Sequence, residues 1–192
     1  MTPLEAVIRE TLQEILSRRQ DVLQIALPLR AKFEHWLKWE LAAALKKRNF
    51  QDVKVEEQFG PTHERSDVSA TYQSQRIHIE LKTANTNWRA EGLANKNRPI
   101  TKNIDGIIHD IKKARQAGLN QLGIIGFVLF PVPVRLWQTE RSQMRERFQR
   151  IEQEGGLRHG EIEAATEYLS CVSDYGLTLT TLAISNAKRP IL

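Results

Sequence analysis

Two carboxylates and a lysine are the residues of this sequence best suited to chemistry. Between Arg76 and Thr83 apolar and polar residues alternate, so a strand at about 76–83 would place His78, Glu80 and Lys82 on one face. An acid and a base would then stand together beside an apolar core.

A third charged group comes from the preceding strand, which we predict to begin at Asp67. With a turn at Ser74-Gln75, the antiparallel register places Asp67 across from Lys82 and Ser69 across from Glu80. Asp67, Glu80 and Lys82 would therefore project on the same side of the sheet.

Such a cluster suits the hydrolysis of phosphodiesters. Asp67 and Glu80, with the backbone carbonyl of Leu81, are hard oxygen ligands of the kind that hold Mg²⁺, with Mn²⁺ as an alternative ion. The ion would activate a water, and Lys82 would orient that water or stabilise negative charge in the transition state. The structural alternative is a ladder of surface ion pairs.

Glu40 is a fourth candidate. On a helix that includes Phe33 and Trp36, Glu40 falls inside the apolar arc, and a carboxylate on a buried face needs a partner. A metal ion or Lys82 would serve.

These residues resemble the PD-(D/E)XK nuclease superfamily, which has a restriction endonuclease-like fold. The resemblance lies in Glu40, in Ser66-Asp67 and in Glu80-Leu81-Lys82, with Ser66 at the position of the family's proline. It implies an α/β core in the order helix, three strands, helix, strand. It also implies a Mg²⁺-dependent endonuclease acting on DNA, with Asp67 and Glu80 as metal ligands, Lys82 as the catalytic lysine and Glu40 as an auxiliary ligand.

A predicted loop from Thr83 to Lys102 follows the cluster and contains residues that could contact nucleic acid. It combines an aromatic ring that could stack on a base with four cations that could bind phosphates: Trp88, Arg89, Lys96, Arg98 and Lys102. A solvated loop explains the same composition. His78 is a weaker candidate for phosphate contact, and Gln58, Ser69 and Thr83 flank the cluster. We interpret the remaining histidines as incidental: His35, His63, His109 and His159.

The predicted elements form a single nuclease domain, residues 1–192, in which helices flank a central mixed sheet. We expect an N-terminal helix at 4–19, a core at about 30–132, and a C-terminal helix and strand at 138–185. The strands are expected at 52–59, 67–73, 76–83, 123–130 and 177–184, with helices at 104–117 and 138–154. The strand at 123–130 is apolar on both faces, which predicts a central position.

Composition adds limits to the function. A net charge of +5 favours an anionic partner such as DNA. The chain has one cysteine, Cys171, which excludes an intrachain disulfide, and it shows neither a signal peptide nor an apolar run long enough to span a membrane. We expect a soluble cytoplasmic protein.

Two other functions remain open. The same chemistry could act on RNA, and a non-catalytic nucleic-acid-binding or assembly subunit could keep the same fold. A small one-site nuclease also often cuts both strands of a duplex as a homodimer, so a homodimer or a protein partner is a further expectation.

Overall fold

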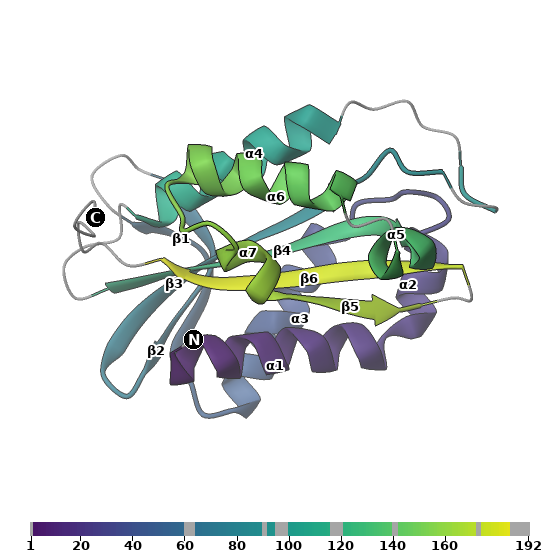
Figure 1. The fold of residues 1–192 in the computed structure, drawn as a ribbon. Helices are drawn as coiled ribbons and strands as arrows, with labels where there is room; N and C mark the ends of the chain where they lie inside the picture. Colours follow the sequence, from purple (N-terminus) through teal and green to yellow (C-terminus); the bar gives the residue numbers. More distant parts are fainter. Residues whose placement is uncertain are drawn as a thin grey trace.

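A six-stranded mixed sheet with helices on both faces forms the centre of the molecule (Figure 1). The structure is a computed structural model, and it describes residues 2–59, 64–89, 92–94, 100–115, 121–139, 142–171 and 174–184. The expectation of an α/β architecture around a mixed sheet is confirmed.

The strands follow the order β1-β2-β3-β4-β6-β5 across the sheet. Their bounds are β1 Gln51–Phe59, β2 Glu64–Tyr72, β3 Gln75–Asn85, β4 Gln121–Pro133, β5 Thr166–Ser170 and β6 Tyr175–Ile184. Only β3 and β4 are parallel, because helix α4 crosses over between them, whereas the other neighbouring pairs are antiparallel.

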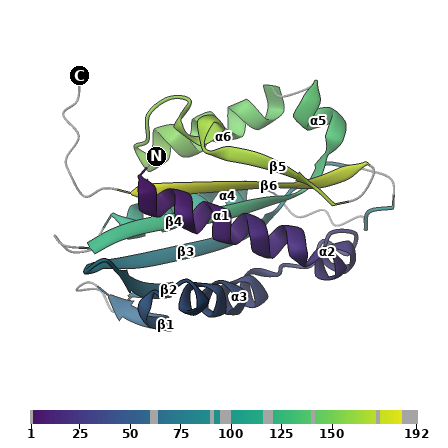
Figure 2. The ribbon, with the colours of Figure 1, turned by 90° about the horizontal axis from the view of Figure 1, so that it is seen from below.

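Two groups of helices cover the sheet. The first group lies on one face (Figure 2) and contains α1 Pro3–Arg18, α2 Gln20–Ala26 and α3 Glu34–Lys47. The second group includes α4 Ile100–Ala114 and α6 Ser142–Gly155 on the opposite face, with the short helices α5 Val134–Gln138 and α7 Glu161–Ala164 nearby. A capping box between Thr2 and Glu5 begins α1.

Strand β4 separates two hydrophobic cores, as its two apolar faces predict. Ile124, Val128 and Phe130 pack with α1 and α3 in one core, whereas Ile125 and Phe127 pack with α4 and α6 in the other. Strand β3 faces the same two layers. Ile77, Ile79 and Leu81 join the first core, and the intervening polar residues point towards α4.

The predicted hairpin register is wrong by two residues. The turn is Gln73-Ser74, and both residues have positive φ angles, 47° and 67°, which suit a two-residue hairpin turn. Ser69 therefore pairs with His78, where we expected Glu80. A shift by two keeps every side chain on its face, so the predicted side for Asp67 is unaffected.

Other boundaries differ from the sequence prediction by a few residues. The predicted loop at 83–102 is shorter, because β3 continues to Asn85 and α4 begins at Ile100. The prediction also missed strand β5 and the short helices α2, α5 and α7. None of the helices described here is both long and apolar enough to cross a bilayer.

Candidate active site

The candidate site lies in a fork between β2 and β3. The registered pairing of these strands ends at Val68 and Ile79, whereas β2 continues to pair with β1 as far as Glu64. The next amides of β3 are bound by carboxylates instead. Leu81 N donates to Asp67 Oδ2 at 2.7 Å, and Thr83 N donates to Glu34 Oε2 at 2.9 Å. The carboxylates of Asp67 and Glu34 thus accept hydrogen bonds from β3 where its pairing with β2 has ended.

Asp67 is held between the fork and helix α3. Its second oxygen, Oδ1, lies 3.6 Å from the Nζ atom of Lys38, and 22% of the side chain is exposed. Lys38 is buried and also binds Glu56 Oε1 at 2.7 Å. Burial lowers the pKa of Lys38, but Glu56 and Asp67 outweigh it and raise the pKa above its ordinary value, so Lys38 stays a cation.

Glu80 is the most buried carboxylate of the site, with 3% exposed. Its Oε2 atom lies 2.8 Å from Lys113 Nζ of helix α4, whereas its buried Oε1 atom has no hydrogen-bond partner among the described residues. Burial raises the pKa of Glu80 to about 8, although Lys113 opposes the shift. At neutral pH Glu80 is therefore mostly protonated in this structure, and a cation bound beside it would favour its ionised form.

Two acids that the sequence analysis did not assign to the site hold the ammonium group of Lys82. Its Nζ atom lies 3.0 Å from Asp110 Oδ2 of α4 and 3.9 Å from Glu34 Oε1 of α3. Burial lowers the pKa of Lys82, but Asp110 and Glu34 outweigh this effect, and the net pKa is raised. Lys82 is therefore protonated at neutral pH and fixed in place.

Glu40 does not join this cluster. Its Oε1 atom accepts hydrogen bonds from Arg19 Nη1 at 2.8 Å and from Trp36 Nε1 at 3.3 Å. The expected partner, a metal ion or Lys82, is therefore replaced by Arg19. The acid that α3 contributes to the site is Glu34, which lies six residues earlier and so on another side of the helix.

Sequence reasoning also missed the contribution of helix α4. Asp110 and Lys113 stand three residues apart, on the side of α4 where Gly106 approaches Lys82, with 3.6 Å between the Lys82 Cε atom and a Cβ atom built on Gly106. A signal was present in the sequence. Asp110 borders the apolar arc of an amphipathic helix, where an acid needs a partner.

Trp88 is not available for base stacking. It is 7% exposed, its Nε1 atom donates to Gln143 Oε1 at 3.0 Å, and the guanidinium of Arg147 lies 4.9 Å from its ring. The expectation of stacking is wrong because the ring belongs to the second core. Arg89 and Lys102 are exposed, as nucleic-acid contacts would require, whereas Lys96 and Arg98 lie outside the described residues.

The other predicted neighbours have structural partners. His78 is buried against the Phe59 ring at 4.6 Å, and burial lowers its pKa, so in this structure it offers no surface to phosphate. Ser69 donates to Glu57 Oε2 at 2.6 Å, and Gln58 is exposed on β1. Thr83 Oγ1 is buried without a hydrogen-bond partner in the described part of the chain.

The donor set fits a hard divalent ion. Among the described residues no group of three His, Cys, Asp or Glu side chains is arranged to hold a metal. Mg²⁺, however, often binds through one or two carboxylates and keeps several waters. Asp67 and the unpartnered oxygen of Glu80 supply that number of carboxylates.

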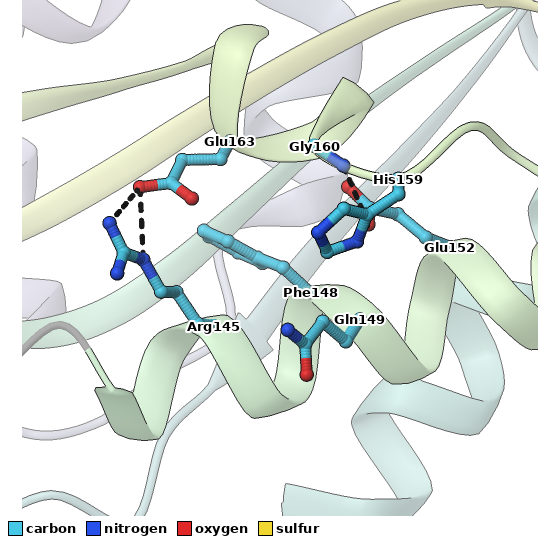
Figure 3. A pocket seen from close by; sticks show the side chains of 7 residues that line it. All are labelled: Arg145, Phe148, Gln149, Glu152, His159, Gly160 and Glu163. Atoms are coloured by element: carbon cyan, nitrogen blue, oxygen red, sulfur yellow. Dashed lines mark hydrogen bonds and ion pairs between the residues drawn. The ribbon is translucent and has the colours of Figure 1, made fainter.

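A separate cavity of about 320 Å³ lies between α6 and α7 (Figure 3). Its buried acid, Glu152, accepts hydrogen bonds from Gly160 N at 3.0 Å and Ile162 N at 2.9 Å, and it lies 3.6 Å from His159 Nδ1. Glu152 therefore fixes the start of α7. No residue of the fork lines this cavity.

We compared the chain with protein-family models, curated proteins and solved structures, and none of the comparisons finds a significant match. The chemistry of the fork is therefore inferred from its geometry and from the motif.

Proposed function

We propose that the protein is a metal-dependent endonuclease that hydrolyses phosphodiester bonds of DNA at the fork between β2 and β3. One observation carries the proposal. A buried carboxylate oxygen, Glu80 Oε1, has no partner among the described residues and stands in one site with Asp67 and a protonated Lys82. A divalent cation would satisfy that oxygen.

The arrangement of elements supports a restriction endonuclease-like fold. Helix α3, the strands β1, β2 and β3, helix α4 and strand β4 follow the order that the PD-(D/E)XK resemblance implies. Asp67 and the Glu80-Leu81-Lys82 motif lie where β2 and β3 separate. The family assignment is part of the proposal.

Each residue of the fork has a role. Asp67 and Glu80 would hold Mg²⁺, with the carbonyl of Leu81 as a further oxygen donor, and the ion would supply a more acidic water and offset phosphate charge. Lys82 presents an ammonium to the charge that develops on the phosphate oxygens. Asp110 and Glu34 position Lys82 and keep it charged.

The overall reaction adds water across a phosphodiester. The oxygen of the water forms a bond to phosphorus, the bond from phosphorus to the leaving sugar oxygen breaks, and that oxygen takes up a proton. The net charge of +5 favours binding of the polyanionic substrate. The same residues could hydrolyse RNA, so a cleavage assay on both DNA and RNA is needed to identify the substrate.

The test is cleavage by purified protein of supercoiled plasmid, single-stranded DNA and RNA, with Mg²⁺, Mn²⁺ or EDTA. We expect metal-dependent cutting of DNA that falls by at least about 100-fold in Asp67→Asn, Glu80→Gln and Lys82→Met. Lys112→Met is the matched control, because Lys112 is exposed on α4 beside Lys113. Equal cutting by wild type and the three fork variants would overturn the site.

A second candidate has an observation of its own. The lysines of the fork are neutralised internally, since Lys113 pairs with Glu80, Lys82 with Asp110 and Lys38 with Asp67. A network of this kind could be purely structural, in a non-catalytic nucleic-acid-binding or assembly subunit. Wild-type protein that binds DNA but fails to cut it with either metal would favour that function.

A further inference from the structure

The outer face of helix α3 carries an exposed tryptophan. Trp39 is 55% exposed, whereas Trp88 is buried. Its orientation is fixed, because Trp39 Nε1 donates to His35 Nε2 at 3.3 Å, and the two rings meet edge to face with centroids 6.3 Å apart. An aromatic ring held in this way loses little freedom when a flat ligand stacks on it.

Exposed basic residues flank this ring along the chain. Lys32, Lys46 and Lys47 are exposed, and no ion pair joins any of them to an acid within the described ranges. We call the exposed set Lys32, His35, Trp39, Lys46 and Lys47 the α3 platform. From His35 to Lys47 it extends for about 18 Å along the helix, enough to meet several nucleotides of a strand.

The α3 platform borders the fork. Glu34 and Lys38 immediately precede His35 and Trp39 in the sequence, and the side chains of this acid and this lysine reach Thr83 and Asp67. The nearby acids are already paired, because Glu40 binds Arg19 and Glu56 binds Lys38. Glu14, which lies close enough to Lys47 to interact electrostatically with it, binds Arg48 at 2.7 Å. The charge left on the face is therefore positive, which favours a polyanion over an apolar protein surface.

We propose that the α3 platform binds a single-stranded or locally unpaired segment of nucleic acid, with Trp39 stacked on a base and the lysines on phosphates. Stacking requires an open base face, which an intact duplex does not offer along its length. The inference rests on the proposed function and assigns it a substrate class, DNA with unpaired bases next to the scissile bond.

The test measures binding in EDTA, so that cleavage does not enter. Fluorescein-labelled single-stranded and duplex DNA of equal length are titrated with protein, and anisotropy is recorded. We expect Trp39→Ala to weaken binding of the single strand by about 10-fold, with little change for duplex, and Trp39→Phe to restore most of the loss. Ile25→Ala, at another exposed apolar residue, is the control and should bind like wild type.

Salt provides a second measurement. A double variant, Lys46→Ala with Lys47→Ala, should lower the slope of log affinity against log salt by about 1.4, or 0.7 for each phosphate of a single strand that the variant no longer neutralises. Circular dichroism confirms that the variants fold.

Two results would overturn the inference. The first is unchanged single-strand binding by Trp39→Ala. The second is loss of self-association, without loss of DNA binding, in that variant, which would make the platform an interface between copies of the chain. Either result leaves the proposed function intact if Asp67→Asn still abolishes cleavage, so the two failures are distinguishable.

Discussion

Lysine side chains occupy the candidate site from two helices, and this has a consequence for cation binding. Lys113 Nζ lies 2.8 Å from Glu80 Oε2, where it occupies a side of the carboxyl group that a divalent ion would use. An internal ammonium and an external ion therefore compete for one group. Lys38 has the same relation to Asp67, but at a longer distance of 3.6 Å.

Measured at a pH high enough to ionise Glu80 in both proteins, Lys113→Met should increase the affinity for Mn²⁺ by about 10-fold, because the ion no longer displaces an ammonium. Relief of the longer-range repulsion between the two cations adds to the gain. Isothermal titration calorimetry measures the affinity directly. Lys112→Met is the control on the exposed side of α4. Unchanged or weaker binding by Lys113→Met would show that Lys113 does not compete with the ion.

The charged residues of β2 and β3 were predictable from the sequence, whereas their partners were not. A period of two places Glu80 and Lys82 on one face whatever the register, and an even register error leaves Asp67 on the same side. The partners Glu34 and Asp110 come from helices. Helical periodicity predicts which face of a helix is buried, but it does not predict how the helix is rotated or where it packs against the sheet. Trp88 was misassigned for a related reason, since Arg147 covers it from distant α6.

At the scale of elements, Glu57 joins three strands. From β1 it accepts hydrogen bonds from Ser69 of β2 and Arg76 of β3, and Lys54 lies 2.7 Å from its Oε1 atom. Burial would raise the pKa of Glu57, but these bonds outweigh it and lower the pKa to about 2. The ionised carboxylate thus stabilises the β1–β2–β3 layer.

The stability that Glu57 contributes depends on pH in a defined direction. Its pKa is lower in the folded state, so the contribution is complete above about pH 4.5 and is lost as the pH falls towards about 2. Glu57→Gln should remove about 2 kcal/mol of unfolding free energy at pH 7, after allowance for solvent screening, and flatten this acid dependence. Urea denaturation between pH 7 and pH 3 checks it, and parallel pH profiles for both proteins would contradict it.

The contact between α4 and β4 depends on a glycine. A Cβ atom at Gly123 would lie 2.3 Å from the carbonyl oxygen of Ala114, at the end of α4, whereas one at Gly126 would meet the flexible tip of Leu12 at 3.1 Å. The backbone of α4 would have to move at the first position but not at the second. Asp110 and Lys113 would move with it.

Gly123→Ala should therefore lower the unfolding free energy by about 3 kcal/mol, in the upper part of the range for overpacked cores. Gly126→Ala is the matched comparison and should cost about 1 kcal/mol or less. Chemical denaturation measures both. Equal losses would mean that α4 is not held by this close approach.

At the scale of the whole molecule, the order of elements in the core was predictable from the sequence, whereas strand β5 and the fork were not. The period changes from helical to alternating near Val53, and the apolar run at 123–130 stands out, so the main strands and helices are found. Strand β5 was missed because Thr166–Ser170 is short and follows a four-residue helix. The fork could not be predicted either, because the separation of β2 from β3 depends on side chains from other elements, such as Glu34 of α3.

Strand β1 forms one border of the sheet, and its backbone is irregular there. Asp52 and Glu56 have positive φ angles of 48° and 56°, and the register with β2 shifts between Gln51 and Lys54. A second chain could not extend the ladder across this border without straightening both residues, and the exposed charges of Lys54 and Glu56 would oppose its approach. The border is therefore protected from strand exchange and fibrillar aggregation, and a homodimer of this protein would not assemble by pairing across β1.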